Sequence, residues 1–231
     1  MTLIENVLRD FRHAVRMLLK TKGFTVAAVT TLGLGIGANT AIFSLVKAVL
    51  IEPLPYQSPD RLVMIWNPAE PRGTTHLSVR EIVGYGDERD SLEQIAGYTE
   101  ANANLTGDED PERVRAGVVT ANLFATLGVP PMLGRTFSAE EGQPGAADVV
   151  MLSQGLWQRR FGGAPDVIGR SIRVNGRART VIGVMPESFR LPLDYRADRP
   201  TEVWLPLTID RANLGAWGDR SYFGIGRLKP V

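Results

Sequence analysis

The feature that most constrains this chain is an uninterrupted apolar segment near its N-terminus. Residues 24–46 are 23 consecutive residues without a formally charged side chain, and they read FTVAAVTTLGLGIGANTAIFSLV. As an α-helix this segment is about 35 Å long, enough to cross the roughly 30 Å hydrocarbon core of a bilayer. It is longer than the core of a signal peptide, and no small-x-small cleavage site follows it. We therefore predict an uncleaved transmembrane helix over residues 24–50, with a signal peptide or a buried core helix as alternatives.

The charges beside this segment predict its orientation. Residues 1–23 carry five basic residues against two acidic ones, whereas the whole chain has 26 basic and 25 acidic residues. Positive charge gathers on the cytoplasmic side of a membrane span. We therefore expect a cytoplasmic N-terminus and an extracytoplasmic domain from about residue 51 onward.

Residues 1–23 are predicted to form a cytoplasmic amphipathic helix. Over residues 3–20, apolar side chains recur at helical spacing, and a basic face lies opposite them. The basic face consists of Arg9, Arg12, Arg16 and Lys20. Such a helix beside a span is expected to lie on the inner leaflet, with its cations near anionic lipid headgroups. Packing of the helix on a partner protein is the alternative, and both interactions can occur together.

The interior of the span carries small and polar residues on two faces. Gly33, Gly37 and Ala41 are spaced by four and share one face, which lets a second helix approach closely. Gly35 and Asn39 fall on roughly the opposite face, and Asn39 lies near mid-membrane, where an unpaired amide is unfavourable. A lone anchor needs neither feature, so the pattern indicates helix neighbours on two sides.

Beyond residue 51 the sequence predicts a mixed domain of helices and strands. A proline-rich segment over 51–60 leaves the span in an extended conformation. Helices are expected over 79–98 with a break near 84–86, over 120–127, and over 154–161, whereas residues 68–76 are expected to form a loop. Strands are expected at eight places, namely 61–66, 98–105, 112–119, 149–152, 171–174, 178–184, 202–205 and 221–228.

The residues that usually carry chemistry are few. The chain has no cysteine and two histidines, His13 and His76, which are predicted to lie on opposite sides of the membrane. His76 near Ser78 is a weak candidate for a hydrolytic site, but no nucleophile-elbow motif accompanies it. No phosphate-binding loop is present, the acidic turns lack calcium-ligand spacing, and no basic patch is large enough for nucleic acid. We expect no enzymatic activity, catalytic residue, metal, cofactor or nucleic-acid partner.

Three long stretches of the sequence resemble one family. KGFTVAAVTTLGLGIGANTAIFSLVKAVLIEPLPYQSPDRLV resembles the first membrane helix and exit loop of MacB/FtsX-type permeases of ABC transporters. TANLFATLGVPPMLGRTFSAEE and VVMLSQGLWQRRFGGAPDVIGRSIRVNGRARTVIGVMPESF resemble the periplasmic core domain of the same family. The stretches occur in the family's order and are most similar to the branch of duplicated orphan permeases.

The resemblance implies an α+β fold in which an amphipathic helix and one transmembrane helix precede a mixed α/β periplasmic domain. Residues 51–125 correspond to the first half of a porter-like subdomain, and residues 126–215 to a small inserted αβ subdomain. Residues 216–231 correspond to the start of the returning porter half. We therefore expect this sequence to be the N-terminal part of a longer permease.

The resemblance also implies a function and partners. Members of the family pair as dimers, bind a separate ABC ATPase subunit, and transmit ATP-driven motion to their periplasmic domains for export or efflux. We accordingly expect a bacterial inner-membrane location, a second permease copy, anionic lipid at the inner leaflet and a periplasmic adaptor. The alternative is a single-span, membrane-anchored periplasmic binding or scaffolding module without transport activity.

Overall fold

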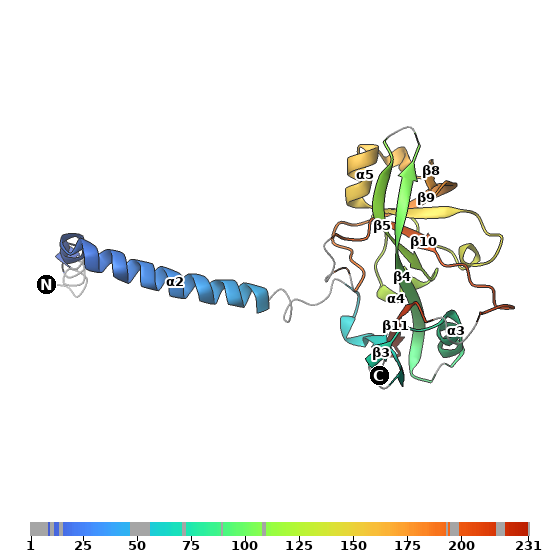
Figure 1. Cartoon of the computed structure of the whole chain (residues 1–231), viewed down its shortest axis with the longest axis horizontal. Helices are drawn as coiled ribbons and strands as arrows, with labels where there is room; N and C mark the ends of the chain where they lie inside the picture. The colour runs from blue at the N-terminus through green and yellow to red at the C-terminus, as the bar shows by residue number, and fades with distance from the viewer. Residues whose placement is uncertain are drawn as a thin grey trace. The chain divides into compact units, whose positions relative to one another are not determined.

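The computed structural model describes residues 9, 12–13, 16–46, 56–70, 73–88, 90–107, 110–192, 194, 199–215 and 220–230. The chain divides into two compact units, Met1–Leu54 and Pro55–Val231. The first unit contains one long helix, α2 (Lys22–Val46), which agrees with the predicted span as far as residue 46 (Figure 1). Residues 47–50 of that span and residues 51–55 of the exit segment lie outside the described residues.

A nine-stranded mixed sheet forms the second unit, in the order β1-β11-β4-β5-β10-β7-β9-β6, with β8 paired to β4 and β9. A separate two-stranded sheet consists of β2 (Asn67–Glu70) and β3 (Gly73–Thr75). The strands of the large sheet are β1 (Leu62–Ile65), β4 (Leu92–Thr106), β5 (Glu112–Val119), β6 (Leu133–Gly134), β7 (Val149–Ser153), β8 (Ser171–Val174), β9 (Arg177–Met185), β10 (Val203–Pro206) and β11 (Phe223–Leu228).

Six of these strands close into a ring. β4 pairs with β5, β5 with β10, β10 with β7, β7 with β9, β9 with β8, and β8 returns to β4. Alternate residues of each strand point to opposite faces, so one set of apolar side chains turns inward. This inner core includes Leu105 of β4, Leu152 of β7 and Val203 of β10. Leu156 of helix α5 (Gln154–Phe161) is fully buried in the same core.

A second core lies on the other face of these strands. It joins Tyr98, Met151 and Trp204 to Phe124 and Leu127 of the short helix α4 (Leu123–Leu127). The rings of Phe124 and Trp204 meet edge to face, with their centroids 6.1 Å apart. A third, smaller core lies under α3 (Val79–Asp87), where Ile82 packs near Leu77 and Ile95.

The helix ends follow the capping residues in the sequence. Ser78 and Glu81 form a reciprocal capping box at the start of α3, because each side chain bonds the backbone N–H of the other. The Ser153 hydroxyl accepts a hydrogen bond from the Leu156 N–H at 3.1 Å and begins α5, which ends at Gly162 with φ 63°. These two helix starts were both predicted from the sequence.

The structure corrects two sequence-based predictions. Residues 92–98, expected to continue a broken helix, form the first half of β4 and pair with β11. Their apolar spacing resembles a helix, but a long-range strand partner overrides this local preference. Residues 68–76, expected to be a loop, contain most of β2 and all of β3. The α+β class, one apolar helix followed by a sheet-rich domain, is confirmed.

The predicted division of the extracytoplasmic region at residues 126 and 216 stays a prediction. Hydrogen bonds join strands from both sides of residue 126, since β5 pairs with β10 and β4 pairs with β8. Strand β11, which falls in the predicted returning segment, lies between β1 and β4 in the large sheet.

The close packing between β9 and the chain that follows β6 can be tested by a substitution at Gly183. A Cβ added at Gly183 would lie 2.3 Å from the backbone carbonyl oxygen of Arg135. A backbone atom cannot move aside as the end of a flexible side chain can, so the added methyl group would clash. We predict that Gly183→Ala lowers the free energy of unfolding by about 1–3 kcal/mol. The measurement is thermal unfolding of the full chain in detergent, followed by circular dichroism.

Gly155→Ala is the matched control, because Gly155 lies in α5 with its nearest contact, the Ser153 hydroxyl, at 4.0 Å. This change should leave the unfolding temperature unchanged or raise it. An equal loss in both variants would contradict the packing at Gly183.

Candidate functional site

Helix α2 is the first candidate site. Among the described residues it is the one helix long and apolar enough to cross a membrane, over Lys22–Ser44, and none of that stretch is buried. Gly33 and Gly37 lie one turn apart, and a Cβ added to either would meet nothing within 4 Å. The predicted packing face of Gly33, Gly37 and Ala41 is therefore open along the helix.

The polar residues of α2 differ in how their hydrogen bonds are satisfied. The hydroxyls of Thr31 and Thr40 donate to carbonyl oxygens one turn earlier, each at 2.8 Å. The side-chain amide of Asn39, in contrast, has no hydrogen-bond partner among the described residues. In hydrocarbon an unpaired amide is unfavourable, so Asn39 is the residue of this helix that most needs a partner from elsewhere.

The chain bends where the basic N-terminal helix meets α2. The Thr25 hydroxyl donates to the carbonyl oxygen of Leu18 at 2.5 Å and to that of Thr21 at 3.0 Å. In a straight helix residues seven apart are about 10 Å apart along the axis, so the first contact requires a bend near Thr21. The described basic residues before it, Arg9, Arg12, Arg16 and Lys20, are all exposed helical residues. Their contact with lipid stays a prediction.

The second candidate site is the point where the chain enters the second unit, Pro55–Val231. Tyr56 is buried, and its hydroxyl donates to the Arg190 carbonyl oxygen at 2.8 Å. The next residue, Gln57, donates its backbone N–H to the Leu127 carbonyl oxygen at 3.2 Å. Gly128, with φ 68°, ends α4 there, and a Cβ on it would lie 2.4 Å from the Cβ of Gln57. The entering chain is thus packed against the end of α4.

Arg227 of β11 holds this entry segment. Its side chain is buried, its Nε donates to the Thr126 carbonyl oxygen at 2.7 Å, and its Nη2 donates to the Gln57 carbonyl oxygen at 2.8 Å. Burial, followed by the nearby Arg61, lowers the pKa of Arg227 from its ordinary value. Arg61 in turn bonds the Leu228 carbonyl oxygen at 2.9 Å and pairs with Glu93. We call Tyr56, Gln57 and Arg227 the entry anchor.

A groove of about 820 Å³ is the third candidate site. Its lining comes from α3, the start of β4, residues 120–125, and residues 136–144 and 207–212. The lining includes apolar side chains such as Ile82, Phe137 and Ile209, and polar ones such as Gln94 and Asn122. Its size suits a drug-sized or peptide ligand. It lies between segments assigned to the predicted porter half and the predicted inserted subdomain.

An ion pair between the exposed Arg135 side chain and the buried Glu141 carboxylate supports one part of the groove lining. Both guanidinium Nη atoms of Arg135 donate to Glu141, at 2.9 and 2.7 Å, and the Ser138 N–H donates to the same carboxylate at 2.8 Å. The Arg135 hydrogen bond lowers the pKa of Glu141, and the pair raises the pKa of Arg135. The ionised carboxylate therefore stabilises the turn that carries residues 136–144.

His76 and Ser78 do not form a hydrolytic pair. The His76 ring stacks edge-on to Phe223 with centroids 4.3 Å apart, and the Ser78 hydroxyl donates to the Glu81 carboxylate at 2.9 Å within the helix cap. Sequence reasoning did not identify the entry anchor or the groove. Each joins residues that are far apart in the sequence, so no local pattern indicates either of them.

The ion pair of Glu141 predicts that the stability of the protein depends on pH. Folding lowers the pKa of Glu141, so its ionised carboxylate stabilises the folded state. This stabilisation is complete at pH values above the pKa of a glutamate in the unfolded chain, about 4.3, and is lost as the pH falls through the lower pKa of the folded state. We predict that Glu141→Gln lowers the free energy of unfolding by about 1–3 kcal/mol at pH 7, and that the difference from wild type shrinks below about pH 4. Denaturant titrations at several pH values measure it.

Glu140→Gln is the control, because Glu140 is the exposed neighbour in the same turn. This change should not reproduce the pH-dependent loss. A difference between Glu141→Gln and wild type that stays constant from pH 7 to pH 3 would contradict the assigned ion pair.

Comparisons with known proteins agree with this architecture. Residues 25–230 match the family described as the MacB-like periplasmic core domain. A search of curated proteins gave no match. A domain of a protein described as a permease from Porphyromonas gingivalis is similar in structure, with TM-score 0.57 and 20% identity over 76% of this chain and 78% of that one.

The periplasmic region of MacB from Actinobacillus actinomycetemcomitans is similar to the same degree, with TM-score 0.57 and 14% identity over 78% of this chain and 79% of that one. These likenesses support the fold, whereas the family match covers nearly the whole sequence. The chain therefore belongs to the MacB-like periplasmic core domain family of ABC transporter permeases.

Proposed function

We propose that this chain is a permease subunit of an ABC transporter of the MacB/FtsX type. It transmits ATP-driven motion of a separate cytoplasmic ATPase to the extracytoplasmic domain, for export or efflux across the bacterial inner membrane. The observation that carries this proposal is the entry anchor. Mechanical transmission requires that the segment following the membrane helix be held firmly by the domain it moves.

The anchor meets this requirement through contacts with several separate elements. Tyr56 lies in the same core as Tyr98 of β4 and Trp204 of β10. Arg227 donates a hydrogen bond to Gln57 from β11, the strand that pairs with both β1 and β4. A displacement of the chain at Tyr56 would therefore act on the centre of the sheet. A flexible tether would need none of these bonds.

Helix α2 supports the membrane side of the proposal. Its open small-residue face suits close packing with another helix, and Asn39 requires a hydrogen-bond donor or acceptor within the membrane. We propose that one face contacts a second permease copy and the other contacts further membrane helices. The exposed basic helix before the bend faces the cytoplasm, where it contacts anionic lipid, the ATPase, or both.

The alternative is a membrane-anchored binding or scaffolding module. The large groove and the compact second unit favour it, because both exist without further membrane helices. A periplasmic adaptor would be a natural partner in either case. The two functions differ in one respect, since only a permease stimulates or depends on an ATPase.

The first test is therefore ATPase coupling. We expect the chain, with any further residues of its reading frame, to co-purify from membranes with an ABC ATPase subunit and to alter its rate of ATP hydrolysis. Failure of a full-length permease to bind an ATPase or change its activity would refute the permease function and leave the module.

The entry anchor gives a sharper prediction. Tyr56→Phe removes the bond to Arg190 and should lower stability by about 0.5–1.5 kcal/mol, while Tyr56→Ala opens the core and should cost about 3–5 kcal/mol. In the assembled transporter we expect Tyr56→Phe to keep ATPase binding but reduce transport per ATP hydrolysed. Stability is measured by thermal unfolding, and coupling by transport and hydrolysis in proteoliposomes.

Tyr85→Phe is the matched control, since Tyr85 is a half-buried tyrosine of α3 whose hydroxyl has no hydrogen bond in the described structure. Tyr85→Phe should leave both the thermal stability and the amount of transport per ATP hydrolysed at their wild-type values. Equal coupling ratios in wild type and Tyr56→Phe would argue against transmission through this contact.

The small-residue face of α2 predicts self-association. Gly37→Ile places a branched side chain on the packing face and should weaken dimer formation in membranes several-fold. Ala38→Ile makes a comparable change about 100° around the helix and should have a smaller effect. Cross-linking in native membranes measures both, and an equal loss in the two variants would contradict a specific packing face.

A further inference from the structure

At the C-terminal end of β4, one face of the large sheet is polar and exposed. Ala103 and Leu105 of β4 point into the inner core, so their neighbours Asn102 and Asn104 point to the opposite face. Both asparagines are exposed, and their side chains make no hydrogen bond with the described residues. The face that carries the second core near Tyr98 is therefore polar and accessible at this end of the strand.

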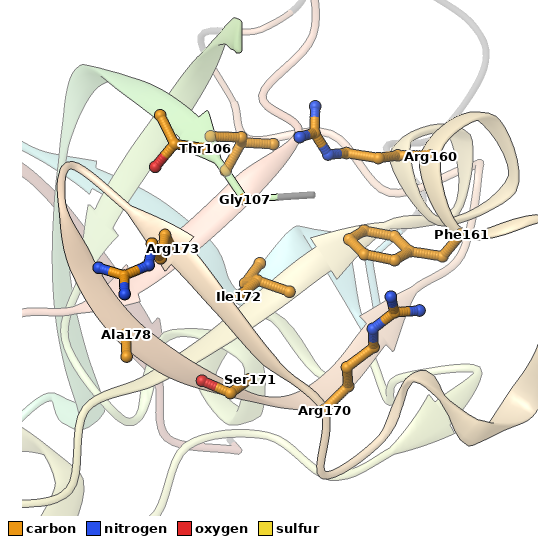
Figure 2. Close-up of a pocket in the computed structure, with 10 residues that line it drawn as sticks. Thr106, Gly107, Arg160, Phe161, Arg170, Ser171, Ile172, Arg173 and Ala178 are labelled. Atoms are coloured by element: carbon orange, nitrogen blue, oxygen red, sulfur yellow. The ribbon is translucent and has the colours of Figure 1, made fainter. Parts of the chain in front are cut away.

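Strand register brings two arginines onto the same face. Arg113 of β5 lies opposite Asn104, and Arg173 of β8 lies opposite Thr106, two residues farther along β4. Residues directly opposite each other point to the same side of a sheet. Figure 2 shows Arg173 pointing to the opposite side of β8 from Ile172, which packs against the inner core. We call Asn102, Asn104, Arg113 and Arg173 the polar strand face.

The two arginines of the polar strand face are exposed, and neither makes a hydrogen bond or an ion pair within the described part of the chain. A cavity of about 540 Å³ lies beside β5, and its two carboxylates, Glu112 and Glu202, both pair with Arg159, at 2.7 and 2.9 Å. Glu100, on the same face of β4, pairs with Arg115 at 2.8 Å. These carboxylates are thus engaged by other arginines, and the two arginines of the face are available to an external anion.

The spacing of the two arginines matches that of side chains on an extended peptide. Arg113 and Arg173 stand on strands separated by β4, at positions two residues apart along it, so their Cα atoms are about 12 Å apart. In an extended chain, residues four positions apart point to the same side and are about 13 Å apart. Carboxylates at two such positions can each reach one guanidinium group and form charge-assisted hydrogen bonds with it.

The asparagines between the two arginine-bearing strands favour a peptide over a phosphate or sulfate polymer. A side-chain amide offers both hydrogen-bond donors and an acceptor, as a peptide bond does, whereas phosphate and sulfate oxygens only accept. Asn102 and Asn104 also repeat along β4 with the spacing of about 7 Å that alternate residues have in an extended peptide. We propose that the polar strand face binds an extended acidic peptide segment of a partner protein, with two acidic residues four positions apart. This proposal does not depend on the permease function.

The test uses the full chain captured in detergent and nine-residue serine and threonine peptides that each contain two glutamates. The matched peptide has its glutamates four positions apart. The control peptide has them three positions apart, where an extended chain points them to opposite sides. By surface plasmon resonance we expect the matched peptide to bind with a dissociation constant on the order of 1 mM or lower, and about three-fold more tightly than the control peptide.

Substitutions on the two sides of the sheet give a matched comparison. Arg113→Gln and Arg173→Gln should each weaken binding of the matched peptide about two- to five-fold, the range expected for an exposed ion pair. Arg177→Gln is the control, because Arg177 is also exposed and makes no ion pair with the described residues. It lies opposite Val174, which belongs to the inner core, and so stands on the other side of the hairpin. Its substitution should leave the affinity unchanged.

Three results would overturn the proposal. They are the lack of saturable binding of the matched peptide, equal binding of the two peptides, and an equal loss of affinity in Arg113→Gln and Arg177→Gln. A heparin hexasaccharide that competes for the same arginines and binds more tightly than the matched peptide would also overturn it, and would identify a sulfated polysaccharide as the ligand. Thermal unfolding of each variant checks that it is folded.

Discussion

The extracytoplasmic unit depends on the insertion of β11 between β1 and β4. This strand, from the end of the chain, pairs with β1 near the start of the unit along one edge and with the first half of β4 along the other. Its inward-facing Arg227 then bonds both the entering chain and the end of α4. A buried guanidinium that satisfies two backbone carbonyls is stabilising only if both stay in place, so this contact joins three distant segments.

The second organising constraint is the closed ring of six strands. Closure removes free sheet edges and encloses an apolar core that α5 covers through Leu156. The ring closes imperfectly, because β8 is longer than the part of β4 that faces it. The large groove is lined by residues of α3, α4 and the turn held by Arg135 and Glu141, and it lies outside the ring.

The candidate sites could be predicted from the sequence to different extents. The glycine face and Asn39 of α2 follow from helical spacing alone, as do the basic residues that precede the helix. The entry anchor depends on Arg227 and Tyr56, which are far apart in the chain, so no local pattern indicates it.

The sequence alone determined the elements whose cause is local. The apolar span, the capped starts of α3 and α5, and the hairpin of β8 and β9 at Asn175 and Gly176 each follow from propensity, capping or turn chemistry within a few residues. The tertiary structure decided the state of residues 92–98, where pairing with β11 outweighed a helix-like pattern. It also decided the ring and the entry anchor, because contacts between distant residues depend on strand order and register, which short-range patterns do not encode.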